Sequence, residues 1–336
     1  MAATIHDVGR LAGVSRSTVS RVLNSKGEVD PQTAAEVWKA VKQLNYQPNI
    51  SARALVRQRT DTIGVMLADI SNPFYELIIK AIEAAATAEG FSVAFYNSYD
   101  DLVGHRQIIA SALEGSKVDG LIVVGSHLGD KSTLLEMAGR GLVLSLIERN
   151  FADPAIPCVV SDNKGGARLA VEHLLRLGHE RIGLITGNLH YQTAIDRMEG
   201  YKETLSGHGV PGEDELIAIG DFEHKSGYEA MKHLLALRHR PTAVFACSDM
   251  MAIGAIQAIG EAGLAVPRDM AVVGYDDITF ASMVYPQLTT VRQPLREMGT
   301  LAAQGLIQRL RKGDEAEPFK KFLPVELVVR RSCGAV

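Results

Sequence analysis

The sequence predicts a small all-α head with a helix-turn-helix, followed by an α/β core of two doubly wound parallel sheets. Residues 1–60 carry apolar side chains at helical spacing and show no strand pattern. From Asp61 onward, short runs of Val, Ile and Leu alternate with helical segments, as in parallel sheets that are covered on both faces. Ten such runs are too many for one sheet of ordinary size, which indicates two sheets.

The first two helices of the head are marked by their caps. Thr4 stands three residues before Asp7, which is the spacing of a capping box. Gly13 allows a turn, and we expect Ser15 to open a second helix by accepting a hydrogen bond from the backbone of Thr18. Helix, short turn and helix make the helix-turn-helix plan. The expected apolar stripe of the first helix is Ile5, Val8, Leu11 and Ala12.

The second helix is suited to a DNA major groove. Arg16, Ser17 and Arg21 lie on the face opposite its apolar side chains. Arginine pairs bidentately with guanine, and serine donates to phosphates or base edges. Residues 1–60 carry a formal net charge of +5 and the remaining residues one of −9, so we expect that only the head binds a polyanion. From charge alone, the alternative is that these charged residues form an ordinary solvated surface that binds no polyanion.

A third helix and a short fourth segment complete the head. Asp30 and Pro31 begin the third helix as its cap and first residue, and Trp38 is interpreted as a packing residue rather than a base-stacking one. Asn49 is placed to cap residues 50–57, a segment too short to be stable alone in water. This segment is either a linker or a helix that folds on DNA.

Five motifs follow one another in the head: Thr4-Ile5-His6-Asp7-Val8, Leu11-Ala12-Gly13-Val14-Ser15, Thr18-Val19-Ser20-Arg21-Val22-Leu23-Asn24, Leu44-Asn45-Tyr46-Gln47-Pro48-Asn49 and Ala52-Arg53-Ala54-Leu55. In order and spacing they resemble the lactose/galactose-repressor family of bacterial transcription regulators. The likeness continues through the whole chain. This combination is much more specific than a helix-turn-helix match alone.

The resemblance implies the contacts with DNA. Arg16, Ser17 and Arg21 would read bases in the major groove, and the polar residues around them would hold phosphates and set the register. In a hinge helix over residues 49–56, Leu55 would wedge between base pairs in the minor groove. The positions expected to contact DNA are Thr4, Ser15, Arg16, Ser17, Thr18, Arg21, Asn24, Asn49, Ala52 and Leu55.

The core alternates strands and helices. Strands are expected at Thr62–Ala68, Phe91–Asn97, Asp119–Gly125, Leu142–Ile147, Cys158–Ser161, Arg181–Thr186, Leu216–Gly220, Ala243–Cys247, Ala271–Tyr275 and Leu288–Arg292, and helices at 74–89, 101–115, 163–177, 194–207, 224–236, 249–262 and 294–312. Ligands of such sheets bind beyond the carboxyl ends of the strands. The loops there carry aromatic rings, Asn, Asp and Arg, which suit a polyhydroxylated ligand. Asp249 is expected instead to cap the helix that follows it.

The core also resembles the periplasmic sugar-binding fold, as the cores of this family do. The resemblance implies effector contacts at Phe74, Glu148, Arg149, Tyr191, Thr193, Arg197, Phe222, Ser248, Asp276 and Gln293. Two positions depart from the family pattern. Ser248 stands where many sugar-sensing members carry Asn, and Tyr191 stands where the purine-sensing branch carries a basic residue, which argues against a purine.

In this fold the chain crosses between the two core subdomains three times, and we place the crossings near residues 160, 290 and 320. The expected division is a head of residues 1–46, a hinge of residues 47–60, an N-terminal core subdomain of residues 61–160 plus about 291–320, and a C-terminal core subdomain of residues 161–290 plus about 321–330. The last strand is expected at Phe322–Val329.

No enzyme chemistry is indicated. The sequence has no P-loop, GxSxG, HExxH or strand-linked GxGxxG motif, and we expect no cofactor and no metal. Cys158, Cys247 and Cys333 are too widely spaced for a disulfide framework or a zinc site. The N-terminus shows no signal peptide and no run is long enough to span a membrane, so we expect a cytoplasmic protein.

These observations predict a ligand-responsive, sequence-specific DNA-binding regulator that represses carbohydrate-related genes. Its expected partners are a palindromic double-stranded DNA operator, a small effector of the sugar or sugar-derivative class, and a second copy, as a homodimer or a dimer of dimers. Effector closure of the cleft would spread the hinge helices and shift the population between DNA-competent and incompetent states. The alternatives are a regulator that senses a nucleoside, a purine or a protein, a sugar-binding protein without a regulatory role, and a sugar-modifying enzyme with a DNA-binding head.

Overall fold

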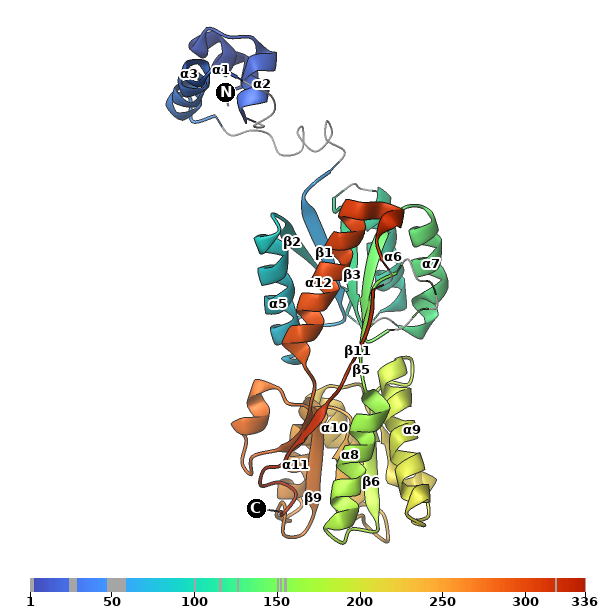
Figure 1. The fold of residues 1–336 in the computed structure, drawn as a ribbon. Coiled ribbons are helices and arrows are strands. Elements are labelled where there is room, and N and C mark those ends of the chain that lie inside the picture. The colour runs from blue at the N-terminus through green and yellow to red at the C-terminus, as the bar shows by residue number, and fades with distance from the viewer. Residues whose placement is uncertain are drawn as a thin grey trace. The chain divides into compact units, whose positions relative to one another are not determined.

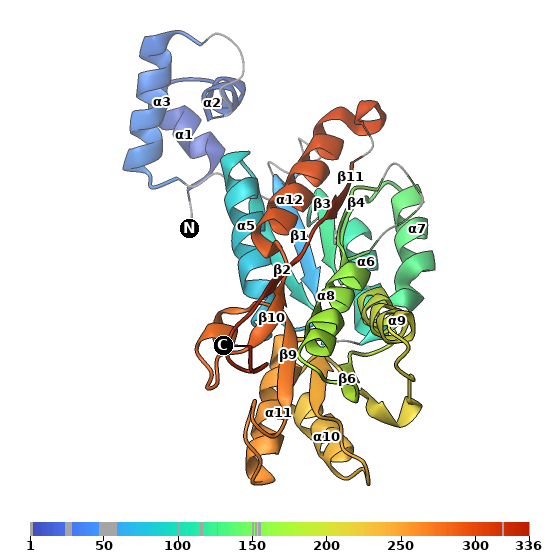
Figure 2. The same cartoon turned by 60° about the horizontal axis from the view of Figure 1, so that its bottom comes forward.

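The computed structural model describes residues 3–23, 29–46, 59–99, 101–114, 117–125, 127–149, 151, 153, 156–317 and 319–335. The chain divides into two units, residues 1–60 and residues 61–336, which we call the head and the core and describe separately. Figure 1 labels the elements, and Figure 2 shows the same chain turned about the horizontal axis.

The described part of the head contains α1 (Ile5–Ala12), α2 (Arg16–Leu23) and α3 (Pro31–Gln43). Its caps are those predicted. Thr4 and Asp7 form a reciprocal capping box, and the Asp30 side chain accepts a hydrogen bond from the backbone of Thr33 at 2.9 Å. Each cap satisfies amide groups that have no partner within the helix, which lets such short helices begin at defined residues.

The interior of the head is small. It is built from Val8, Val19, Val22, Val37 and Ala40. Leu11, which was expected in the apolar stripe of α1, is 46 % exposed, because the neighbouring Val8, Ile5 and Ala12 occupy the strip that faces the other helices. Trp38 on α3 is 52 % exposed, so its ring is not part of this interior.

The first half of the core is a parallel six-stranded sheet. Its strand order is β11-β5-β4-β3-β1-β2, with β1 (Thr62–Leu67), β2 (Ser92–Asn97), β3 (Gly120–Val124), β4 (Val143–Ile147), β5 (Cys158–Ser161) and β11 (Lys320–Leu323). The helices α5 (Phe74–Ala88) and α12 (Leu295–Lys312) share one buried cluster with Ile63, Val65 and Leu67, while α6 (Leu102–Glu114) and α7 (Lys131–Gly139) pack near Met66 on the opposite face. Burial on both faces explains the continuous apolar runs.

The second half is a second six-stranded sheet, in the order β12-β10-β9-β8-β6-β7. Its strands are β6 (Ile182–Thr186), β7 (Ile217–Ile219), β8 (Ala243–Ala246), β9 (Ala271–Asp276), β10 (Thr289–Arg292) and β12 (Glu326–Val328), and only β12 pairs antiparallel, with β10. The helices are α8 (Asn163–Arg176), α9 (Gln192–Gly207), α10 (His224–Leu235) and α11 (Asp249–Glu261). The described core also has four short 3₁₀ turns. Two lie in the first half, η1 (Leu128–Asp130) and η4 (Gly313–Glu315), and two in the second, η2 (Asp214–Leu216) and η3 (Thr279–Ser282).

The chain passes between the two halves at three places: after β5, after β10, and between β11 and β12. The paired strands β5 and β11 run side by side at the junction (Figure 1). The single last strand expected at Phe322–Val329 is wrong: it is two short strands, one in each sheet. Pro324 follows the first of them, and proline cannot donate a ladder hydrogen bond, which favours a break there.

Candidate functional site

A cavity of about 260 Å³ lies between the two halves of the core. Both halves contribute loops that follow the carboxyl ends of parallel strands, which is where ligands bind in doubly wound sheets. The cavity is lined by Ala68, Asp69, Asn72, Phe74, Tyr75, Tyr99, Gly125, Glu148, Tyr191, Thr193, Arg197, Asp221, Phe222, Glu223, Ser248 and Asp276.

The backbone at this cavity is strained. Four of its lining residues adopt positive φ although none is glycine: Tyr99 (54°), Glu148 (60°), Phe222 (72°) and Asp276 (118°). Side chains other than glycine disfavour this region, and such conformations gather at functional sites where the surrounding structure enforces them. Each of these four residues ends a strand or follows one, and its side chain lines the space between the two sheets.

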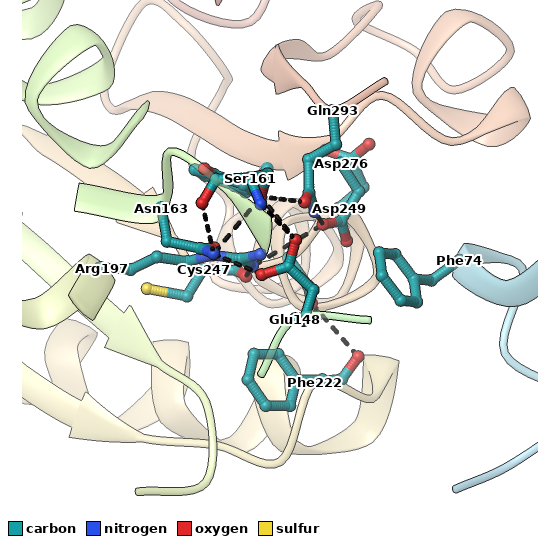
Figure 3. Close-up of polar contacts among 12 residues, drawn as sticks. Phe74, Glu148, Ser161, Asn163, Arg197, Phe222, Cys247, Asp249, Asp276 and Gln293 are labelled. Carbon is teal, nitrogen blue, oxygen red and sulfur yellow. Dashed lines mark hydrogen bonds and ion pairs between the residues drawn. The ribbon is translucent and has the colours of Figure 1, made fainter. Parts of the chain in front are cut away.

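Arg197, on α9, is the cation at the floor of the cavity. Its side chain is buried, and its Nε donates to Asn163 Oδ1 at 2.8 Å while its Nη1 donates to the carbonyl oxygen of Cys247 at 2.5 Å (Figure 3). The guanidinium also lies 3.7 Å from the ring centre of Tyr275 and 3.7 Å from Asp276 Oδ1. These contacts hold a planar cation in one orientation without water.

Glu148 joins this cluster from the first half. Ser161 Oγ lies 2.6 Å from Glu148 Oε1 and 2.7 Å from Gln293 Oε1, and the backbone N–H of Ser161 donates to Glu148 Oε1 at 3.1 Å. Burial raises the pKa of Glu148, although the hydrogen bonds from Ser161 and Asn163 and the nearby Arg197 favour its charged form. Asn163 donates to the other carboxyl oxygen at 2.5 Å.

Asp276 and Asp249 are two further buried carboxyls of the second half. Burial raises the pKa of Asp276 to about 7, although Arg197 and a hydrogen bond from Gln293 favour its charged form. Burial and the nearby Asp276 likewise raise the pKa of Asp249. Two like charges in a dry site disfavour double ionisation, so the charge of Asp276 disfavours the ionised form of Asp249.

The expected capping role of Asp249 is wrong. Ser248 is the cap of α11, and its Oγ accepts from the backbone of Met251 at 3.2 Å. Asp249 is buried, and it accepts from Thr290 Oγ1 at 2.5 Å and from the backbone of Ile278 at 2.9 Å. The carboxylate therefore ties α11 to the neighbouring strand and loop, an arrangement that sequence spacing does not reveal.

Aromatic rings form two sides of the cavity. Phe74, at the start of α5, and Phe222, from the second half, flank Glu148 (Figure 3). The Tyr191 and Phe222 rings meet edge to face, with centroids 6.1 Å apart. Gly187 lies beneath Phe222: a Cβ there would be 2.1 Å from the ring, so only glycine leaves the ring in place. Flat apolar faces beside hydroxyl-binding groups are what a sugar ring contacts.

In the head, α2 presents the polar face that the sequence predicted. Arg16, Ser17 and Arg21 are exposed, whereas Val19 and Val22 are buried. Ser15 Oγ accepts from the backbone of Thr18 at 3.1 Å and also lies 2.7 Å from Ser17 Oγ. The amino-terminal turn of the helix thus gathers hydroxyls and a guanidinium on one surface, a combination that suits a phosphate backbone and base edges.

Comparison with known proteins assigns the chain. Residues 4–49 match a family described as bacterial regulatory proteins of the lacI family, and residues 171–333 match a periplasmic binding protein-like domain. The transcriptional regulator CelR of Thermobifida fusca is 36 % identical over 335 residues, which cover 98 % of each chain. The chain belongs to the lacI family of bacterial transcription regulators.

Other relatives agree on the family. The transcriptional repressor PurR of Mannheimia succiniciproducens is 36 % identical, with 98 % of each chain covered. The solved structure of the lac repressor dimer bound to operator and the anti-inducer ONPF matches this chain with a TM-score of 0.88 and 31 % identity, and the match covers 99 % of each chain. A solved CelR–cellobiose complex matches with a TM-score of 0.75 and 34 % identity, and the match covers 98 % of this chain and 99 % of the CelR chain. The predicted family and fold class are confirmed, and the protein is a ligand-responsive, DNA-binding transcriptional regulator.

The structure brings eight of the ten expected effector residues to the cavity, namely Phe74, Glu148, Tyr191, Thr193, Arg197, Phe222, Ser248 and Asp276. Gln293 stands behind them, where it donates to Asp276 Oδ1 at 2.7 Å. Arg149 points elsewhere and donates to the carbonyl oxygen of Leu128 at 3.3 Å. Six of the expected DNA contacts lie in the described part of the head: Thr4, Ser15, Arg16, Ser17, Thr18 and Arg21. The other four, Asn24, Asn49, Ala52 and Leu55, lie outside the described residues.

Eight lining residues were not among the expected effector contacts: Ala68, Asp69, Asn72, Tyr75, Tyr99, Gly125, Asp221 and Glu223. The signal that would have found them is their position, because each follows closely after a strand. Asn72 Nδ2 donates to Glu223 Oε1 at 2.8 Å, a contact between the two halves that sequence alone does not show. Within the described ranges no group of three or more metal-ligating side chains is assembled, and no helix has the length and apolarity needed to cross a bilayer.

Proposed function

We propose that this regulator binds an uncharged carbohydrate between the two halves of its core and that binding changes its affinity for operator DNA. The observation that carries the proposal is the composition of the cavity, where Phe74, Tyr191 and Phe222 offer ring faces beside Asp276 and Arg197. Ring faces and bidentate polar groups together match a polyol better than a purely apolar ligand.

The charges at the cavity favour a ligand without a negative charge. Its lining contains five carboxyl side chains, Asp69, Glu148, Asp221, Glu223 and Asp276, but a single guanidinium. That guanidinium, of Arg197, already faces Asp276, so it offers little attraction to a phosphate or a carboxylate. An anion would therefore meet a negative field in a partly dry site, whereas hydroxyl groups would find acceptors.

The relatives support this class. The solved complex of CelR, a relative of similar length, contains cellobiose, and a lacI-family regulator of Enterococcus faecium that is 28 % identical was solved with ribose. Two transcriptional repressors named PurR are equally similar in sequence. Tyr191, however, supplies an aromatic ring to the cavity and no cation, which favours a sugar over a purine.

We further propose that the core subdomains are residues 61–160 with about 291–320 and residues 161–290 with about 321–330, following a head of residues 1–46 and a hinge of residues 47–60. The three passages of the chain between the sheets support this division. Effector closure would rotate one subdomain on the other about these passages and so alter the hinge. An effector that prefers one arrangement shifts the population toward it.

For DNA, we propose that Arg16, Ser17 and Arg21 read bases and that Thr4, Ser15, Thr18 and Asn24 hold phosphates. Asn49, Ala52 and Leu55 would act in the minor groove, with Leu55 as the wedge. A palindromic operator would be bound by two heads of a homodimer, which two-fold symmetry favours, and two dimers could pair further. The exposed polar face of α2 supports the base-reading role.

The effector proposal is tested by thermal shift and by operator binding with the full chain. Cellobiose, ribose, a uronic acid, hypoxanthine and guanine form the panel, because a bound ligand raises the melting temperature by mass action. We expect a neutral sugar to stabilise the core, and Arg197→Ala to abolish that effect while operator affinity is retained. Arg168→Ala, an exposed arginine on α8, is the matched control. Stabilisation by a purine alone, or by the uronic acid alone, would overturn the proposed class.

The DNA proposal has its own test, since operator fragments can be selected from the genome and titrated by fluorescence anisotropy. Affinity should fall steeply with salt. Arg16→Ala should relax base preference at one position of each half-site, with a cost of about 1 to 3 kcal/mol. A uniform loss across all sequences would reassign Arg16 to a phosphate.

A further inference from the structure

A side-chain hydrogen bond joins the two halves of the core at the edge of the cavity. Asn72, in the loop between β1 and α5, belongs to the first half, and Glu223, which precedes α10, belongs to the second. Asn72 Nδ2 donates to Glu223 Oε1 at 2.8 Å, and both residues line the cavity. We call this hydrogen bond the latch, and the arrangement in which it is formed the closed arrangement.

The latch lies on the side where the cavity meets solvent. Asp221, which is exposed, lines the cavity and accepts a hydrogen bond from the backbone N–H of Glu223 at 2.9 Å. The polar groups of the cavity floor, Glu148, Arg197 and Asp276, are all buried. A ligand that reaches this floor from solvent therefore enters from the side of the latch.

The donor end of the latch is fixed to the first half. Asn72 Oδ1 accepts from the backbone N–H of Phe74 at 3.0 Å, and this bond orients the side-chain amide. The backbone N–H of Asn72 donates to the carbonyl oxygen of Asp69 at 3.1 Å, and the backbone N–H of Ile70 donates to Asn97 Oδ1 at 3.1 Å. The same amide group thus holds the latch and the first turn of α5, which carries the Phe74 ring.

The acceptor end is fixed to the second half. Ser248 Oγ donates to the carbonyl oxygen of Phe222 at 3.2 Å, and Phe222 holds a φ of 72°. Glu223 follows directly, so its position is coupled to that of the Phe222 ring. Because each loop is tied to its own half, the latch sets the separation of the two aromatic walls, Phe74 and Phe222 (Figure 3).

We infer that Asn72 and Glu223 are positioning residues that hold the effector cavity closed, and that the effector enters and leaves only when the latch opens. The inference rests on the proposed function in placing the effector in the cavity. Neither residue is required to contact the effector. Their role is to keep the two ring walls at the separation at which both can contact one ligand.

One hydrogen bond favours closure and still allows opening. Its loss changes an equilibrium or a rate by about threefold to tenfold. The latch is formed in the closed arrangement whether or not the effector is bound, so its loss lowers the barriers to entry and to release alike. The two rate constants should therefore rise together, while the affinity changes less than either rate.

The first experiment measures closure without any effector. Spin labels are attached to Ala84→Cys on α5 and His233→Cys on α10, which are exposed positions on the helices that follow the two latch residues. Cys158, Cys247 and Cys333 are buried, so labelling is selective. The labelled full chain is mixed with an excess of unlabelled chain, so that electron double resonance reports distances within one chain.

Asn72→Asp is the variant that breaks the latch. It keeps the shape of the side chain and the acceptor for the backbone of Phe74, but it places a carboxylate against Glu223, and two carboxylates repel. The label distance should lengthen. Adding Glu223→Gln supplies an amide that donates to the new carboxylate, so the double variant should return to the parent distance. Glu223→Gln alone should also keep that distance, because its amide oxygen still accepts from Asn72.

Asn97→Asp is the matched control, because Asn97 accepts from the backbone of Ile70 within the first half. Its label distance should equal that of the parent, and lengthening there would assign the effect to any added carboxylate. An unchanged distance in Asn72→Asp, or equal lengthening in Asn72→Asp and the double variant, would overturn the latch. These outcomes do not depend on the identity of the effector.

The second experiment measures binding rates by surface plasmon resonance on the immobilised full chain. The probe is cellobiose or ribose, whichever stabilises the parent protein more in the thermal-shift panel. In Asn72→Asp the association and dissociation rate constants should each rise by about threefold to tenfold, and the double variant should restore both. A residue that only shaped the cavity would change the affinity mainly through dissociation.

The two experiments separate the latch from the effector class. If dissociation alone becomes faster in Asn72→Asp, the latch does not control entry and the inference is wrong. If neither sugar binds while the label distances change as expected, the failure lies with the proposed effector, and the latch stands.

Discussion

Replacing Asp276 by Asn tests whether ionisation of this buried carboxyl lowers the free energy of unfolding. Asp276 is 4 % exposed, and burial raises its pKa to about 7. An aspartate in an unfolded chain ionises near pH 3.9. Asparagine has nearly the same shape and can still accept the hydrogen bond from Gln293 Nε2, which spans 2.7 Å. The substitution removes the ionisation, and with it the ion pair to Arg197 at 3.7 Å and the repulsion of the Asp249 carboxylate.

The expected magnitude follows from the two pKa values. Between about pH 4 and pH 7 the folded protein holds a proton on Asp276 that the unfolded chain has released. The stability that the neutral form contributes is therefore lost as the pH rises through this range. Between pH 5 and pH 8 the loss amounts to about 2.5 kcal/mol for the wild-type core. We expect no such loss of stability in Asp276→Asn, because the amide does not titrate.

Urea unfolding followed by far-UV circular dichroism measures the difference. The free energy of unfolding of Asp276→Asn relative to wild type should rise by about 2.5 kcal/mol between pH 5 and pH 8. Asp214→Asn on η2, whose side chain is 98 % exposed, serves as a control with the same change of charge. A difference that stays constant over this range would mean that Asp276 is ionised throughout, and the account of the buried acids would be refuted.

Three further changes probe other parts of the molecule. Gly187→Ala puts a methyl group 2.1 Å from the Phe222 ring, so the ring should move into the cavity and calorimetry should show about tenfold weaker binding of whichever sugar stabilises the parent protein; unchanged affinity would contradict the packing argument. Glu148→Gln should change the unfolding free energy by less than about 1 kcal/mol if Glu148 is protonated, whereas a large destabilisation would show that the charge is needed. Thr4→Ala removes the α1 capping box and should cost the head about 1 kcal/mol, visible as faster amide hydrogen exchange in α1; exchange in the core should not change.

The local features of the head were predictable because they depend on neighbours in sequence. Thr4, Ser15 and Asp30 act on amides three residues away, and a spacing of three is visible in the sequence. Exposure was harder to predict. Leu11 has the spacing of a buried residue but is largely exposed, since which strip of a short helix is covered depends on how α2 and α3 approach it.

In the core, strands were predictable from composition because both faces of each sheet are covered, and the apolar runs are accordingly continuous. The helix α7 was not expected, since its apolar residues are few and Leu135 stays exposed. The role of Asp249 was assigned wrongly because a carboxylate before a helix looks like a cap whether or not it is one. Its actual partners, Thr290 and Ile278, are 41 and 29 residues away.

The sequence by itself determined the family, the helix-turn-helix and the alternation of strands and helices, which follow from periodicity, from capping and from motifs whose spacing is local. Half of the residues that line the cavity were expected as well, because the resemblance to the family implied them. The tertiary structure alone decided which side chains meet across the two halves. The ion pair between Arg197 and Asp276, the raised pKa of Asp276 and the contact between Asn72 and Glu223 all arise where segments distant in sequence exclude water together. The electrostatics of a dry site depend on that packing, and no local pattern encodes it.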